Sequence, residues 1–184
     1  KWTCFTRVDR VDAELLALMR DAGCWAVAFG LESGNDVSLK RMRKGVTVRQ
    51  NTDGVKVAKS AGLQVIGAFI LCLPGEDEKM SLNTIRFAKS LRLDTVVFFL
   101  PVPFYGTKLY EECKKEGGLA ENINWEDFKQ WMDQENPLYI NPLIGKKRMV
   151  ELYNYAVRSY YLSPTFVLRS LRHIRSFSDF KKYL

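Results

Sequence analysis

The sequence has no apolar run long enough to cross a membrane. A membrane-spanning helix needs about 20 consecutive apolar residues, whereas the longest apolar run here, residues 65–73, has the length of a buried strand and is interrupted by Gly67. The first residues also lack the charged and apolar regions of a signal peptide. We therefore expect a cytoplasmic protein, or one that associates with a membrane only at its surface.

Cysteine and histidine are scarce. The four cysteines are too far apart in sequence to form a CxxC or CxxxCxxC ligand set, so we expect reduced thiols that pack as small apolar side chains and no metal site on this chain. The single histidine, His173, lies far from any nucleophile-elbow motif, which argues against a Ser–His–Asp triad. The dinucleotide fingerprint GxGxxG, the P-loop motif and the zinc motif HExxH are also absent.

The chain carries an excess of positive charge. Its 184 residues are 47% hydrophobic and 27% charged, which is typical of a soluble folded domain, and the net charge is +7. We interpret the excess as a solvated face of C-terminal helices rather than a nucleic-acid surface, because much of it lies late, at Arg158, Arg169, Arg172, Arg175, Lys181 and Lys182. The first residue is Lys1 and a strand-like segment begins at once, so we expect an excised piece of a longer protein.

A repeat of helix, turn and apolar run organises the first hundred residues. Ala-Gly pairs at residues 22–23 and 61–62 stand at matching places before two such runs, which indicates an internal βα repeat. The runs are almost continuously apolar, as strands covered on both faces by helices must be. We predict parallel strands at residues 2–8, 25–31, 63–73 and 95–100, joined by right-handed crossovers through helices at residues 12–21, 36–42, 48–60 and 79–90.

After residue 107 the pattern changes. Residues 107–116 favour a helix that Gly117-Gly118 stops, whereas residues 123–144 are irregular and rich in Trp, Asn and Pro. Residues 146–162 favour an amphipathic helix, which Ser163-Pro164 ends because proline is tolerated at a helix start but not in its interior. Short helices are expected at residues 165–173 and 178–183.

Three loops rich in glycine and polar residues follow the predicted strands, at residues 32–35, 74–76 and 101–107. Because the carboxyl ends of parallel strands meet at one rim, ligand sites of α/β proteins form there. Carboxylates and hydroxyls can hydrogen-bond a ribose or an amino group, and glycine lets the backbone come close to a ligand. We therefore expect Glu32, Glu76 and Gly106 to surround one mouth, with ordinary turn chemistry as the alternative for each loop.

Several spaced motifs resemble those of radical S-adenosylmethionine (radical SAM) enzymes. Residues 28–34, followed by Leu39, Met42, Arg43, Lys44 and Gly45, are similar to the family's FGIESG…L…M.KG segment. Residues 58–63 and 67–76 are similar to A…AGI.V.G.FI.GLPGE, and residues 98–110 to F…P.PGT.LY. The resemblance covers about residues 2–118, and it is strongest to the cobalamin-binding, BchE-type group that includes magnesium-protoporphyrin cyclases.

The resemblance implies an α/β fold, half of a (β/α)6 partial TIM barrel over residues 1–118, followed by an irregular segment and a basic helical extension over residues 119–184. In the family a 4Fe-4S cluster, held by CxxxCxxC, binds SAM and cleaves it reductively to a 5′-deoxyadenosyl radical that abstracts hydrogen from a substrate. The motif is absent here, so this chain is expected to be inactive alone and to supply pocket residues to a parent oxidoreductase or methyltransferase. A small-molecule substrate, tetrapyrrole or lipid-like, an electron donor for the cluster and cobalamin in an upstream domain are further expectations.

The resemblance also assigns residues to the SAM site. Glu32 and Ser33 are expected to contact the ribose or methionine part, and Arg43 the SAM carboxylate, which suits the guanidinium fork. The residues expected near the adenine are Ile70, Leu71, Leu73, Pro101 and Pro103. Two departures affect this assignment: Cys72 stands where the family usually has Gly, and Phe104-Tyr105 replaces the usual Tyr-Pro pair.

Two other functions stay open. A non-catalytic βα scaffold would bind nucleic acid or an anionic membrane through its tail, where Phe166, Leu168 and Leu171 interleave with Arg and Lys. Another parallel α/β enzyme would bind a phosphorylated ligand at the same rim, although no phosphate-cradling motif is present. A half barrel also exposes a severed sheet edge, from which we expect an oligomer of this fragment.

Overall fold

The computed structural model describes residues 1–120, 123–124, 128 and 134–171. Along the chain the elements are β1 (Trp2–Thr6), a 3-10 turn η1 (Val8–Arg10), α1 (Ala13–Asp21), β2 (Cys24–Glu32), α2 (Asp36–Arg41), α3 (Val48–Ser60), β3 (Gln64–Ile70), α4 (Glu78–Ser90), β4 (Thr95–Phe99), α5 (Lys108–Lys115), α6 (Lys146–Tyr161) and α7 (Pro164–Leu171). The strands and helices predicted up to residue 171 are confirmed, with ends moved by at most a few residues. The helix expected at residues 178–183 lies outside the described residues.

Capping side chains set where the helices begin. Asp12, Thr47, Asp77 and Thr107 each precede a helix and accept a hydrogen bond from the backbone N–H three residues on. At Thr47 the bond is reciprocal, because the Gln50 side chain accepts from the Thr47 N–H. These four side chains therefore fix where α1, α3, α4 and α5 begin.

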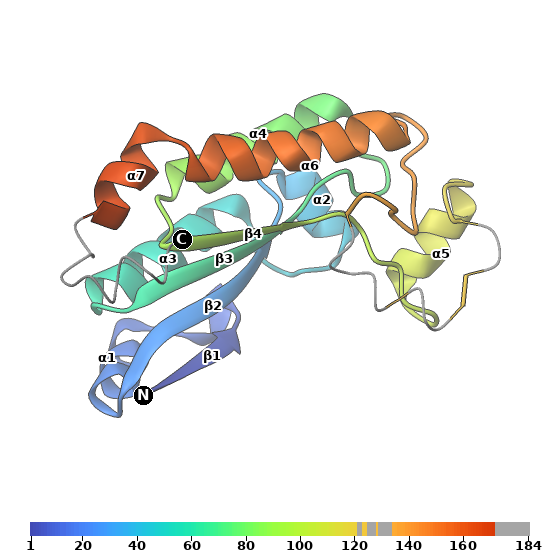
Figure 1. Ribbon diagram of the computed structural model, residues 1–184. Helices are drawn as coiled ribbons and strands as arrows, with labels where there is room; N and C mark the ends of the chain where they lie inside the picture. The colour runs from blue at the N-terminus through green and yellow to red at the C-terminus, as the bar shows by residue number, and fades with distance from the viewer. Residues whose placement is uncertain (121–122, 125–127, 129–133, 172–184) are drawn as a thin grey trace.

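The strands form one parallel sheet in the order β1-β2-β3-β4, so each strand pairs with the next along the chain. Helices α4 and α6 lie along one side of β3 and β4, and α1 and α3 pack against the same side of the sheet further along (Figure 1). A parallel wall with its helices on one face is the arrangement of a section of a (β/α) barrel. The predicted fold class is confirmed.

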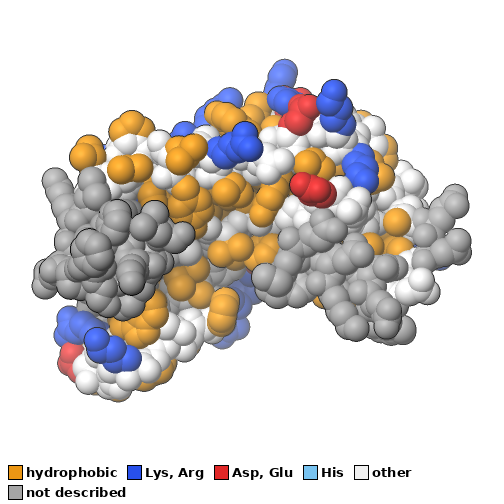
Figure 2. All heavy atoms as spheres, viewed as in Figure 1, with side chains coloured by type: hydrophobic (Ala, Val, Ile, Leu, Met, Phe, Trp, Pro, Cys, Tyr) orange, Lys and Arg blue, Asp and Glu red, His pale blue; other side chains and the backbone are white. Residues whose placement is uncertain are grey.

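The two faces of this wall differ. Phe69 and Phe98 point to the helices, are buried, and hold their rings 5.9 Å apart. On the opposite face Gly30, Ala68 and Val97 form one row in register, and Val97 is 36% exposed. We expected helices on both faces, which is wrong for the described residues: the second face is the inward face of a barrel wall, and it is apolar for that reason. Hydrophobic side chains reach the surface across the middle of the molecule below α6 (Figure 2).

The C-terminal helices pack onto the same core as the strands. The buried residues of α6 are Met149, Leu152, Ala156 and Tyr160, and Tyr160 Oη donates to the Leu93 carbonyl at 2.6 Å. Arg169 of α7 donates to the carbonyls of Arg92 and Leu93 beyond the end of α4. This basic residue therefore supports the structure, whereas Arg172, Arg175, Lys181 and Lys182 lie outside the described residues. The division into residues 1–118 and 119–184 stays a prediction.

The structure also shows the state of the cysteines and the character of the described helices. Cys4, Cys24, Cys72 and Cys113 are free thiols, and all but Cys4 are buried. None of the described helices has the length and apolar character that crossing a membrane requires.

Candidate functional site

The loops after β2 and β3 meet at the carboxyl edge of the sheet and share a hydrogen-bond network. Ser33 Oγ donates to Glu76 Oε1 at 3.2 Å, and Ser38 Oγ of α2 donates to the same oxygen at 2.5 Å. The other carboxylate oxygen accepts from the Leu73 N–H at 3.3 Å and from Ser81 Oγ at 3.4 Å. The two loops expected at one rim are therefore in direct contact.

Glu76 lies beneath this rim rather than in the mouth where we expected it. The residue is 1% exposed. Burial raises the pKa of its carboxyl group above the ordinary value, although the hydrogen bonds from Ser38, Leu73, Ser33 and Ser81 act in the opposite direction. Its position follows from those donors, which converge on it from the loops after β2 and β3 and from α2 and α4. Glu76 therefore organises the rim and does not itself face a ligand.

Glu32, in contrast, lies over the inward face of the sheet. It ends β2 in a left-handed conformation, with φ of 62°, after a register shift between Gly30 and Glu32 that re-aims the side chain. A Cβ added to Gly30 would come within 2.5 Å of Glu32 Oε1. The carboxylate therefore sits directly above a glycine, on the row that continues to Ala68.

Lys44 completes the polar group at this point. Its Nζ donates to Glu32 Oε1 at 2.8 Å, and the two side chains are only 19% and 16% exposed. We expected Arg43 to supply the cation, but the Arg43 side chain is exposed and its backbone is left-handed, with φ of 53°. The M.KG spacing quoted above contained the signal for Lys44, which we missed. A contact between Arg43 and a ligand stays a prediction.

The other assigned residues differ in what they offer a ligand. Ile70 is partly exposed and pairs with Phe99 on the inward face. Leu71 and Leu73 are 0% and 2% exposed, so their side chains are packed inside the protein. Ser33 is fully buried as well. Contacts from these residues to SAM stay predictions, and the accessible side chain among them is that of Ile70.

The loop after β4 leaves the same edge. The Leu71 N–H donates to the Phe99 carbonyl at 2.9 Å, and the Leu100 N–H donates to Gln134 Oε1 at 2.7 Å. Pro101 and Pro103 follow and are buried. Gly106 has φ of 76°, and a Cβ placed on it would meet nothing within 4 Å. All three loops therefore leave one end of the parallel sheet, as predicted.

Cys72 occupies a backbone position that suits glycine. Its φ is 60°, a region that side chains other than glycine rarely adopt, and this explains why glycine is usual there in the family the motifs resemble. Ser81 Oγ accepts from the Cys72 N–H at 2.9 Å and holds the strained residue in place. Burial raises the pKa of the thiol to about 12, so Cys72 is a packed, unreactive side chain.

The described residues fit SAM but not an iron–sulfur cluster. A carboxylate above a glycine, next to an ammonium group, offers an acceptor for ribose hydroxyls and a partner for a carboxylate. Within the described part of the chain, no three His, Cys, Asp or Glu side chains gather closely enough to hold a metal ion. Of such a site, the described residues can therefore build only the part that would face SAM.

Comparisons with known proteins agree with this geometry. Residues 1–88 match the Radical SAM superfamily. An uncharacterized methyltransferase of Pyrococcus horikoshii is 31% identical over 92% of this chain and 36% of its own length. The anaerobic magnesium-protoporphyrin IX monomethyl ester cyclase of Cereibacter sphaeroides is 28% identical over 63% of this chain and 19% of its own length.

A solved structure shares the fold. The radical S-adenosylmethionine methyltransferase TsrM from Kitasatospora setae, solved with cobalamin and a 4Fe-4S cluster, superimposes with a TM-score of 0.56 and 18% identity over 80% of this chain and 29% of its own. The chain thus spans about a third or less of these proteins. The sequence match, the parallel barrel wall and the polar rim lead to one conclusion: this chain belongs to the radical SAM superfamily.

Proposed function

We propose that this chain forms the SAM-facing part of the barrel of a radical SAM enzyme. The observation that carries the proposal is the Glu32–Lys44 pair, which lies above Gly30 at the carboxyl end of β2 on the uncovered face. With its cluster, SAM supplies the 5′-deoxyadenosyl radical that abstracts hydrogen from the substrate. The residues of this chain bind and orient SAM for that step.

Each side chain has a separate part in this proposal. Glu32 accepts hydrogen bonds from the ribose hydroxyls. Lys44 holds that carboxylate in place through its hydrogen bond and offers its remaining N–H groups to the SAM carboxylate. Ile70 presents an apolar surface to the adenine. Pro101 and Pro103 shape the third side through the backbone, because their side chains are buried.

Reconstitution tests whether SAM cleavage requires the intact protein or whether this chain is sufficient for it. The intact protein, supplied with iron and sulfide without oxygen and reduced by dithionite, is expected to release 5′-deoxyadenosine from SAM. The 184-residue chain treated in the same way is expected to release none, because its cysteines cannot form a cluster site. Liquid chromatography measures the product. Product from the isolated chain, or none from the intact protein, would contradict the proposal.

The relatives support methyl transfer and a bound cobalamin. Two of the three proteins compared above are named as methyltransferases, and the TsrM structure contains cobalamin. We propose that the parent enzyme also binds cobalamin, outside the present residues. We also propose that an electron donor reduces the cluster, and that the fragment self-associates through the outer edge of β1.

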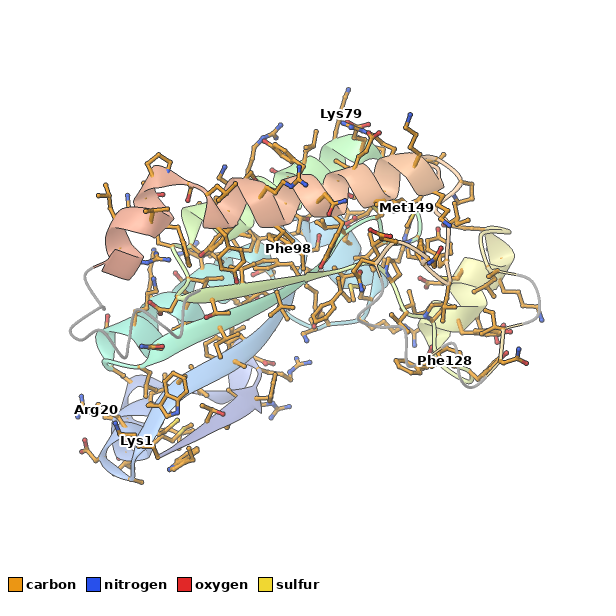
Figure 3. The ribbon with its side chains drawn as sticks, in the orientation of Figure 1. Lys1, Arg20, Lys79, Phe98, Phe128 and Met149 are labelled. Atoms are coloured by element: carbon orange, nitrogen blue, oxygen red, sulfur yellow. The ribbon has the colours of Figure 1, made fainter. Side chains whose placement is uncertain are left out.

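An aromatic cluster beside the mouth favours a flat substrate. Phe104 stacks on Phe128 with centroids 5.1 Å apart and planes at 20°, and Tyr105 contacts both Phe128 and Tyr110. Phe104 and Tyr105 are nevertheless 47% and 38% exposed. Phe128 lies beyond the carboxyl ends of the strands, beside α5 (Figure 3). Exposed rings at this place would stack on a conjugated ring system, which favours a tetrapyrrole over a lipid-like substrate.

Replacing Phe104 by Ala is expected to weaken the binding of protoporphyrin IX to the intact protein by about five- to tenfold, as the loss of one aromatic contact and its buried area implies. A titration followed by porphyrin absorbance measures this. The control is Tyr155→Ala in α6, which removes a ring that is 53% exposed away from the mouth and should change the affinity little. Equal effects of the two substitutions would show that porphyrin binds to exposed apolar surface in general and not to the cluster.

A further inference from the structure

Asn141 lies just before α6, outside the residues that match the family, and is completely buried. Its Nδ2 donates to the carbonyls of Leu73 and Glu76, both at 2.9 Å, and lies 3.4 Å from that of Cys72. Its Oδ1 accepts from the Leu143 N–H at 2.8 Å. One side chain thus joins the loop after β3 to the C-terminal segment.

This loop needs such a partner because its backbone is unusual. Cys72 and Gly75 both have left-handed φ angles, of 60° and 71°, so the chain turns sharply and gathers carbonyl groups on one side. Buried carbonyls without a donor are strongly unfavourable. A primary amide supplies two N–H groups from one point, which a backbone N–H cannot do.

The contacts continue from Asn141 to the mouth. Glu76, whose carbonyl Asn141 holds, receives the hydrogen bond of Ser33 through its carboxylate. Ser33 directly follows Glu32, whose left-handed backbone places its carboxylate over Gly30. Asn141 is therefore linked to Glu32 through two hydrogen bonds and one peptide unit.

A second contact from the same segment is independent of Asn141. Gln134 accepts a hydrogen bond from the Leu100 N–H at the end of β4, so residues 134–141 contact the carboxyl ends of both β3 and β4. The segment leads directly into α6, whose Met149 lies beside these strand ends (Figure 3). The Asn141 N–H also lies 3.2 Å from Met149 Sδ.

We propose that Asn141 is a positioning residue for the SAM-facing rim: it fixes the loop after β3 and, through Glu76 and Ser33, the orientation of Glu32. Only the effect of Asn141 on SAM binding rests on the proposed function. Its effect on the position of the loop does not. It assigns to the C-terminal segment a role in the site that the family match over residues 1–88 does not cover.

Hydrogen–deuterium exchange on the intact protein tests the contact chain without any need for activity. Asn141→Asp keeps the shape and the acceptor for Leu143 but loses the donors to Leu73 and Glu76. We expect the amides of residues 73–76 and 33–35 to exchange at least tenfold faster than in the wild type. The control Asn154→Ala, at an exposed position on α6, should leave them unchanged. Faster exchange limited to residues 138–145 would overturn the proposal.

SAM affinity, measured by calorimetry on the cluster-reconstituted protein, tests the consequence. Asn141→Asp is expected to raise the Kd about five- to thirtyfold while the protein stays folded; if it does not fold, Asn141→Ser replaces it. Unchanged affinity with a loosened rim would overturn the positioning role. A wild-type protein that binds no SAM would instead overturn the proposed function, and the exchange result would then still decide whether Asn141 holds the rim.

Discussion

Replacing Glu76 by Ala is expected to lower the free energy of unfolding by about 3 kcal/mol. The substitution removes the acceptor that Ser33, Ser38, Ser81 and the Leu73 N–H share, and it leaves a cavity at a residue that is 1% exposed. The contacts between the loops after β2 and β3 would be lost together. Urea denaturation of the wild type and the variant measures the difference.

Glu111→Ala is the matched control, because Glu111 is exposed on α5. Its effect should stay within about 0.5 kcal/mol, as for most surface substitutions. A Glu76 variant as stable as this control would show that the buried carboxylate does not hold the rim together.

Comparison with Glu76→Gln isolates the pH dependence that the Glu76 carboxyl group gives to stability, and the sign of this dependence can be predicted. Burial raises the pKa of Glu76 in the folded protein above the ordinary value of 4.5, so the folded state keeps this proton to a higher pH than the unfolded chain does. Between the two pKa values the folded state binds more protons, and stability falls as the pH rises. The glutamine variant lacks this titration.

The free energy of unfolding of the wild type, relative to the Glu76→Gln variant, is therefore expected to fall as the pH rises from about 4.5 through the raised pKa. Urea denaturation of both proteins over this pH range measures the difference, in which the titration of all other groups largely cancels. A difference that rises with pH would mean that the folded protein favours the ionised carboxylate.

The second large effect is expected on SAM binding. Glu32→Gln removes the ionic acceptor from the mouth, and we expect the intact, reconstituted protein to bind SAM about ten- to a hundredfold more weakly, as the loss of a charge-assisted hydrogen bond implies. Gly30→Ala should have a similar effect by a different route. Its new Cβ would lie 2.5 Å from Glu32 Oε1 and 2.9 Å from Lys44 Nζ, so the pair must move.

Calorimetric titration with SAM measures both variants, with Glu111→Gln as a control of the same chemistry at an exposed position. If the Glu32 and Gly30 variants bound SAM as tightly as this control, the ion pair would lie outside the SAM site. Loss of affinity in the Glu32 variant alone would indicate that the carboxylate contacts SAM without help from its position above Gly30.

The fold could be predicted from local signals. Asp12 and Thr47 mark helix starts through their own side chains, and the repeated Ala-Gly pairs end helices where the backbone turns left-handed, as at Gly23 and Gly62. The strand order could be expected because the strands of consecutive βα units usually lie next to each other in the sheet. The inward face was misjudged because an apolar run alone does not reveal whether a helix or the interior of a barrel covers it.

The site was predictable only in part. The three loops were found because each follows a strand, but the depth of Glu76 depends on hydroxyls from three elements that no local pattern reveals. Lys44 and Arg43 are neighbours, and only the end of α2 decides which of them points to Glu32. Asn141 lies 65 residues from Glu76 in an irregular segment, where sequence periodicity gives no information about contacts.

A crystal structure of the intact protein with SAM bound tests the central claim most directly. The account predicts the SAM ribose within hydrogen-bond distance of the Glu32 carboxylate, and the adenine against Ile70 between the loops that follow β3 and β4. SAM bound at the amino ends of the strands, or on the helix-covered face of the sheet, would contradict it.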